Sequence, residues 1–194
     1  MPRDGQTDFR HTDAMRIDLS VDGHPVVVRD LEPADERAVL AVFDASDDWF
    51  VAATGQPSAP GDVQSAYYSL PEGYDFDDKV LLVIEADREV VGFVDALRRY
   101  PHTASVGIGT FLIRPEFRRL GIGRSVVRAL SAAAAEQDVA QISTHVAEGW
   151  APGRKFLAAL GADFSAPVSP GGGNRTVGPA EGARKVIPAT LVIA

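Results

Sequence analysis

The sequence contains no cysteine and only four histidines among its 194 residues. Without cysteine the chain has no disulfide bond, no thiolate metal site and no cysteine nucleophile. The histidines (His11, His24, His102 and His145) are scattered and show none of the spacings that bind zinc. We therefore expect no metal site.

Long apolar runs and an excess of positive charge are also missing. No apolar segment approaches the ~18 residues of a membrane span, and the polar start lacks the apolar stretch of a secretory signal. The formal net charge of -8 argues against a general nucleic-acid-binding protein, which must neutralise phosphates. The charge either attracts cationic partners or only keeps the protein in solution. We expect a cytoplasmic protein with no nucleic-acid or membrane partner.

The remaining composition is that of a globular domain. Hydrophobic residues make up 45% of the chain and charged residues 24%, which is enough for a core without cross-links. The length suits one domain. We predict that residues 1–20 are disordered or loosely ordered, and that residues 21–194 form a single domain.

The order of the predicted elements indicates the fold class. Neither a regular alternation of strands and helices nor an all-β pattern fits, so the prediction is an α/β (α+β) fold, with a mixed sheet and helices on both faces. Gly107 and Gly109 weaken their strand or permit a bulge, and Trp49 and Phe50 fall between the first two helices. Strands are expected at 26–31, 80–85, 90–97, 105–113, 141–146, 162–168 and 186–193, and helices from about Pro33 to before Asp47 and at about 62–70, 121–137 and 152–160.

The turn RRLGIG at 118–123 joins the strand at 105–113 to the clearest helix of the chain. Gly121 and Gly123 let a ligand approach the backbone closely. The first N–H groups of the helix have no partner within it and lie at the positive end of its dipole. Arginines at 118, 119 and 124 add charge. The pattern predicts a pyrophosphate site, and its plainer interpretation is a strand–helix turn with solvated arginines.

Two common phosphate motifs do not fit this turn. A P-loop requires Gly-Lys-Ser/Thr, but Arg124 follows Gly123. A dinucleotide fingerprint requires a third glycine where Val126 stands.

The constellation as a whole resembles the coenzyme A signature of the GNAT superfamily, the acyl-CoA-dependent N-acetyltransferases. The resemblance rests on Arg118-x-x-Gly121-x-Gly123, on the apolar strand that ends in Arg-Pro-Glu before it, and on the apolar helix after it. The element order and the segment 142–161 agree with it, but only 111–124 is specific. It implies a GNAT-like, mostly antiparallel, twisted sheet of about seven strands with helices on both faces.

The resemblance also implies an activity and a donor site. An acetyl group would pass from acetyl-CoA to a primary amine of a small molecule or peptide by direct attack, with no metal. The strand at 142–146 would splay away from the strand before it to admit the thioester, and a homodimer is expected. The implied coenzyme A-binding residues are the pantetheine contacts Leu112 and Ile113 and the pyrophosphate contacts Arg118, Arg119, Leu120, Gly121, Ile122, Gly123 and Arg124.

Two departures from the family pattern concern catalysis. Leu157 stands where many members carry a tyrosine that protonates the leaving thiolate, and the strand at 105–113 has no glutamate. Substitutes for proton transfer are Asp95, His145 and Tyr100. Their plainer interpretations are a solvated carboxylate for Asp95 and a structural histidine for His145.

The acceptor site is the least patterned part of the sequence. Trp49, Phe50 and Trp150 are candidate substrate-binding residues, and core packing explains the first two equally well. The missing tyrosine and glutamate also permit a different function, a non-catalytic acyl-CoA-binding or regulatory domain.

Overall fold

The computed structural model describes residues 14–169 and 184–193. Within them the chain builds a sheet of eight strands in the order β1-β2-β3-β4-β5-β6-β8-β7. Every neighbouring pair is antiparallel except β5 and β6, which confirms the mixed, mostly antiparallel sheet. The strands are β1 (Arg16–Val21), β2 (His24–Asp30), β3 (Lys79–Ala86), β4 (Glu89–Arg98), β5 (Ser105–Ile113), β6 (Gln141–Ala147), β7 (Asp163–Phe164) and β8 (Val186–Val192).

The N-terminal segment is more ordered than predicted. Residues 16–20, expected to be loose, belong to β1, which pairs along its whole length with β2. Ile17, Leu19 and Val21 alternate with polar residues, so one side of the strand packs against the core. This period of two was the missed signal. Residues 1–13 lie outside the described residues.

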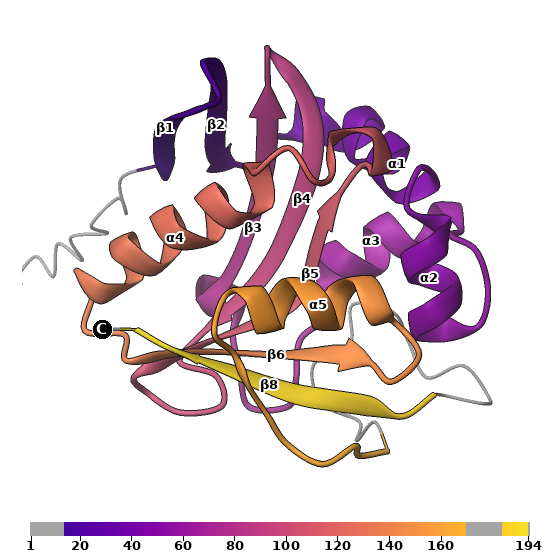
Figure 1. Cartoon of the computed structure of the whole chain (residues 1–194), viewed down its shortest axis with the longest axis vertical. Coiled ribbons are helices and arrows are strands. Elements are labelled where there is room, and N and C mark those ends of the chain that lie inside the picture. Colours follow the sequence, from indigo (N-terminus) through magenta and orange to yellow (C-terminus); the bar gives the residue numbers. More distant parts are fainter. Residues whose placement is uncertain (1–13, 170–183, 194) are drawn as a thin grey trace, which may run out of the picture.

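Helices cover both faces of the sheet (Figure 1). On one face lie α1 (Glu36–Asp44), α2 (Asp47–Thr54) and α3 (Pro60–Tyr68), and on the other lie α4 (Ile122–Ala135) and α5 (Ala151–Ala159). Helix α2 was not predicted, so Trp49 and Phe50 lie within a helix rather than between helices. Acidic residues in its first turn favour its N-terminus, and Gly55 ends it in a left-handed conformation.

The sheet separates two hydrophobic layers. Val28, Ile84 and Val94 pack with Ile122 and Val126 of α4. On the opposite face, the side chains of α1, α2 and α3 pack with others from β3, β4 and β5. This second layer contains Val39, Val42, Phe43, Phe50, Val63, Ala66, Val83, Phe93 and Leu112.

Strand β5 carries two irregularities that shape the site. Asp95 of β4 pairs with Thr110, but Ala96 pairs with Ile108, so Gly109 is an extra residue in a β-bulge. On its other edge, β5 pairs with β6 only from Ser105 to Ile108. Beyond that point the two strands diverge (Figure 1). The predicted splay is confirmed, and so is the permitted bulge.

Candidate functional site

The turn before α4 folds as its glycines require. A 3-10 turn, η3 (Pro115–Phe117), follows β5, and then Arg119 and Gly121 adopt left-handed φ values of 66° and 82°. Gly121 is the N-cap of α4, and no side chain caps it among the described residues. The N–H of Ser125 donates to the carbonyl of Gly121 at 3.0 Å. The N–H groups of residues 122–124 therefore precede the helical ladder and are available to an anion.

Close packing fixes the start of α4 against its neighbours. A Cβ on Gly123 would lie 3.2 Å from Cδ1 of Ile113 and 3.3 Å from Cε2 of Phe156. The Phe156 ring stacks on Phe111, with the ring centroids 5.9 Å apart. Glycine at 123 thus lets the helix N-terminus sit between the end of β5 and α5.

The arginines of the turn have different environments. Arg119 and Arg124 are exposed, so their charges can reach a bound anion. Arg118, in contrast, is only partly exposed, and its Nε donates to the carbonyl of Ile113 at 2.6 Å. Its guanidinium also pairs with Asp48 of α2. Two predicted coenzyme A contacts, the Arg118 side chain and the Ile113 carbonyl, are therefore engaged with each other.

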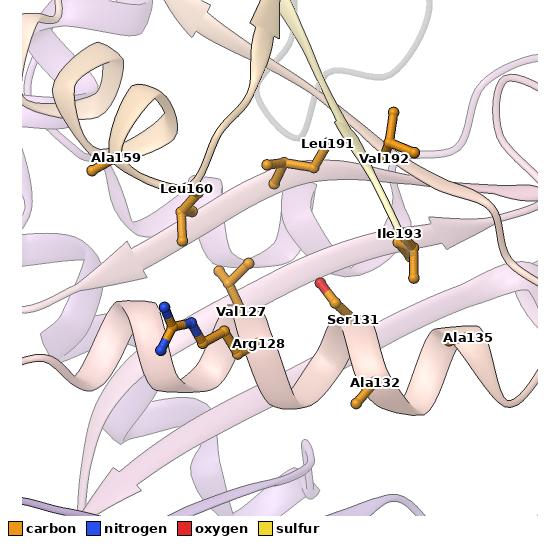
Figure 2. A pocket seen from close by; sticks show the side chains of 10 residues that line it. All are labelled: Val127, Arg128, Ser131, Ala132, Ala135, Ala159, Leu160, Leu191, Val192 and Ile193. Atoms are coloured by element: carbon orange, nitrogen blue, oxygen red, sulfur yellow. The ribbon is translucent and has the colours of Figure 1, made fainter.

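A cavity of about 320 Å³ lies on the same face of the sheet as the turn. Figure 2 shows it between the middle of α4, the end of α5 and the last residues of β8. Apolar side chains form most of its lining, and Arg128 supplies a charged group. The space between α4 and α5 is therefore only partly filled by side chains.

Strand alternation places two of the three predicted catalytic residues, His145 and Asp95, on the opposite face, and Tyr100 follows the end of β4. Val146 packs toward α5, since a Cβ on Gly153 would lie 3.0 Å from its Cγ2. His145, the next residue along β6, consequently points toward the face of α1, α2 and α3. Ser143 shares that orientation, and its hydroxyl lies 3.5 Å from the carbonyl of Tyr100.

Asp95 lies on this face as well, because it alternates with Phe93, which packs in the layer of α1, α2 and α3. Its solvated interpretation is wrong, because only 4% of the residue is exposed. Nζ of Lys79 lies 3.0 Å from its carboxylate. A carboxylate neutralised in this way is a poor free base.

The protonation states of the other two candidates suit proton transfer. Desolvation lowers the pKa of His145 below its ordinary value of 6.5, although the residue is exposed by surface area. Burial raises the pKa of Tyr100 above its ordinary value, and the neighbouring Tyr74 adds to this shift. The two rings meet edge to face at 5.4 Å. Near pH 7, His145 is a neutral acceptor and Tyr100 a protonated donor.

The aromatic candidates for the acceptor site divide into core and surface. Phe50 is 1% exposed and packs against Phe43, so it is a core residue and not an exposed substrate wall. Trp49 is half-buried with its ring centroid 4.9 Å from that of Phe50. Trp150 is also half-buried, and its indole covers Gly153, where a Cβ would lie 2.3 Å from Cδ1.

The family is decided by a sequence comparison. The family model described as Acetyltransferase (GNAT) family matches residues 44–162, which is more than half of the chain. The chain belongs to the GNAT acetyltransferase family. No curated protein matches the sequence.

Solved GNAT structures share the fold at low sequence identity. An acetyltransferase from Thermus thermophilus superposes with a TM-score of 0.65 at 18% identity, over 92% of this chain and 99% of that one. The GNAT domain of PAT from S. lividans gives 0.66 at 17% identity, over 91% and 96%. The ribosomal-protein-S18-alanine N-acetyltransferase from Escherichia coli gives 0.60 at 15% identity, over 87% and 94%.

Two further observations concern residues 14–169 and 184–193. No helix there is long and apolar enough to cross a membrane. No three histidine, aspartate or glutamate side chains gather there in a group that could hold a metal ion.

Sequence reasoning missed two residues of the site, Asp48 and Lys79. Asp48 reaches Arg118 across 70 positions of sequence, and no local spacing encodes such a contact. Lys79 pairs with Leu97, and Asp95 pairs with Leu81, so Lys79 and Asp95 are diagonal neighbours that meet only through this register of β3 and β4. The sequence did contain one signal for this pair. The apolar strand β3 begins with a lysine, and its hairpin partner β4 carries an aspartate.

Proposed function

We propose that this GNAT protein transfers an acetyl group from acetyl-CoA to a primary amine of a small molecule or peptide by direct attack. The observation that carries the proposal is the uncapped, glycine-bounded N-terminus of α4 at the end of a strand that diverges from its neighbour. The first feature suits a pyrophosphate. The second ends the pairing with β6 after Ile108, on one edge of β5 only.

The donor would enter from the face of α4 and α5. Its pyrophosphate would accept from the N–H groups of Gly121, Ile122, Gly123 and Arg124, with Arg119 nearby. Its pantetheine arm would run along β5 past Leu112, where the strand has no β6 partner. The bulge at Gly109 interrupts the ladder with β4. A backbone N–H at this point would stabilise the developing oxyanion.

The acceptor would approach from the face of α1, α2 and α3. Its nitrogen attacks the thioester carbonyl, the C–N bond forms and the C–S bond breaks, leaving an amide and a thiolate. His145 would accept the proton that the amine loses, and Tyr100 would protonate the thiolate. Correct orientation of the two reactants would supply much of the acceleration.

The acceptor itself is not selected by the fold. One structure of similar fold is named a ribosomal-protein-S18-alanine N-acetyltransferase and another a phosphinothricin N-acetyltransferase. A protein N-terminus and a small molecule therefore both belong in any assay.

A non-catalytic acyl-CoA-binding domain is the second candidate. It is favoured by Leu157 at the position of the usual tyrosine and by the pairing of Asp95 with Lys79. Both features remove a group that could transfer a proton, and neither affects the residues that we propose for binding acetyl-CoA.

Thiol release from acetyl-CoA across a panel of amines, amino acids, aminoglycosides and peptide N-termini separates the two. The protein has no cysteine and adds no background to a thiol reagent. Release that depends on one acceptor class supports the transferase. Binding without release supports the second candidate. Binding is checked by thermal unfolding, because a ligand at a hundredfold excess over its dissociation constant stabilises by about 2.7 kcal/mol.

A further inference from the structure

Arg118 joins three elements at the open end of the splay between β5 and β6. Its Nε donates to the carbonyl of Ile113, the last residue of β5, at 2.6 Å. Nη1 and Nη2 donate to the two carboxylate oxygens of Asp48 at 2.5 and 3.2 Å. Its guanidinium carbon lies 5.9 Å from the ring centroid of Trp150, which follows β6.

Each partner of Arg118 is itself held in place. Asp48 lies in the first turn of α2, and its Oδ1 also accepts from the N–H of Trp49 at 2.9 Å. Trp150 is the N-cap residue of α5, and its indole fills the space that Gly153 leaves open. The guanidinium therefore connects α2 with the end of β5 and with Trp150, the residue that begins α5 after β6.

This arrangement differs from that of a phosphate ligand. Both oxygens of Asp48 already occupy the fork of the guanidinium, which is the geometry that would otherwise hold a phosphate. The pair is also partly exposed, with 25% and 45% of the two side chains accessible, so it adds little to stability. Its main effect is geometric, since one planar group sets three distances at once.

We propose that Arg118 is a positioning residue, which fixes the width of the cleft between β5 and β6 and ties α2 to the turn at 118–123. The inference rests on the proposed function for the location of the donor. Because of this contact, a ligand that fixes the position of the turn also restricts the motion of α2, and a ligand that fixes α2 restricts the motion of the turn.

The test uses acetyl-CoA as the probe and compares Arg118→Gln, Arg118→Lys, Asp48→Asn and the double variant Asp48→Asn/Arg118→Gln. Calorimetry at two salt concentrations gives the dissociation constants. Asp47→Asn is the matched control, because the Asp47 carboxylate accepts from the N–H of Ser58 at 2.9 Å and makes no ion pair with Arg118. Thermal unfolding checks that every variant is folded.

The chain's two tryptophans provide a second readout, since Trp49 adjoins Asp48 and Trp150 lies under Arg118. In a Trp49→Phe background, the emission reports Trp150 alone. We expect Arg118→Gln and Asp48→Asn to change this emission alike, and Asp47→Asn to leave it unchanged.

For binding, we expect each single variant to weaken acetyl-CoA affinity roughly fivefold and the double variant to weaken it no further. Arg118→Lys should behave like Arg118→Gln, because an ammonium cannot replace the planar fork. The salt dependence should stay that of the wild type, since no phosphate contact is lost.

Other results overturn the inference. If Arg118→Lys retains wild-type affinity while Arg118→Gln reduces the salt dependence, and Asp48→Asn binds as well as wild type or better, then Arg118 is a phosphate ligand. If all variants match the wild type in affinity and emission, the contact positions nothing. A wild-type protein that fails to bind acetyl-CoA instead removes the proposed function, and the inference with it.

Discussion

Nζ of Lys79 lies 3.0 Å from a carboxylate oxygen of Asp95, and only 6% and 5% of the two side chains are exposed. Lys79 also donates to the carbonyl of Ser69 at 2.8 Å, just after the end of α3. The pair therefore links β3, β4 and α3 on the face of the sheet that α1, α2 and α3 cover. A buried ion pair of this kind is sensitive to the loss of either member, because the other charge then lies in a medium that solvates it poorly.

Replacing Lys79 with methionine should reduce the free energy of unfolding by about 3–5 kcal/mol, because it leaves the Asp95 carboxylate without its cation. The double variant Lys79→Met/Asp95→Leu should recover most of this loss, since neither charge remains. Urea unfolding measures both. A single variant as stable as the wild type, or a double variant no better than the single, contradicts the assignment of a tightly coupled pair.

Replacing Gly121 with valine should abolish acetyl-CoA binding. The residue has a φ of 82°, and an added Cβ would lie 3.3 Å from Cγ1 of Val21, so the side chain forces the turn to shift. Gly73→Val is the matched control: φ is 86° there, and nothing lies within 4 Å of an added Cβ. Both changes strain the backbone similarly. Equal affinities by calorimetry would show that the turn is not the donor site.

Two further glycines have opposite surroundings. An added Cβ on Gly92 would lie 2.6 Å from the carbonyl oxygen of Leu112 and 2.9 Å from Cδ1 of Ile84, whereas one on Gly61 of α3 would meet nothing within 4 Å. Gly92→Ala should therefore lower the free energy of unfolding by about 1–3 kcal/mol through overpacking. Gly61→Ala should raise it by about 0.4–1 kcal/mol. The same sign for both in urea unfolding would contradict the packing described around β4.

The turn at 118–123 could be predicted from the sequence because its determinants are local. Gly121 and Gly123, the preceding apolar strand and the following helix lie within a few positions of one another. The hairpin of β3 and β4 was predicted almost to the residue for the same reason, since β-branched runs and turn residues mark it. Strand β1 was missed, and β7 covers only Asp163–Phe164 of the predicted 162–168. What could be predicted from the sequence is therefore the half of the site that we propose for the donor.

The acceptor half depends on contacts that no local pattern encodes. Helix α2 has few strong helix formers, and its position follows from Phe50 packing against Phe43 and from Asp48 pairing with Arg118. Asp95 is a buried partner of Lys79 rather than a solvated carboxylate, and this contact depends on the register of β3 and β4. These features become visible only when the chain is folded.

His145 should give the transferase a pH profile with an acidic limb below pH 6.5. As a base the imidazole must be neutral, and desolvation lowers its pKa from the ordinary 6.5, so protonation stops the reaction only at lower pH. The kcat at saturating acceptor, which reports the groups of the bound complex, should stay on its plateau as pH falls to about 6.5 and then decline. Loss of thioester absorbance measures this without a pH-sensitive reagent.

The variant His145→Gln tests whether His145 is the catalytic base or has no role in the reaction. If His145 accepts the proton, the variant should lower kcat by about 10²-fold or more and remove the acidic limb. Folding stability gives an independent sign: the unfolded chain, with the higher histidine pKa, binds the proton first, so the native state loses stability as pH falls below 6.5. The variant should lessen that loss. A different outcome would be an acidic limb that persists in His145→Gln while the stability profile changes as expected. Desolvation would then lower the pKa of His145 without giving the residue a catalytic role, and the proton would leave through another group or through water.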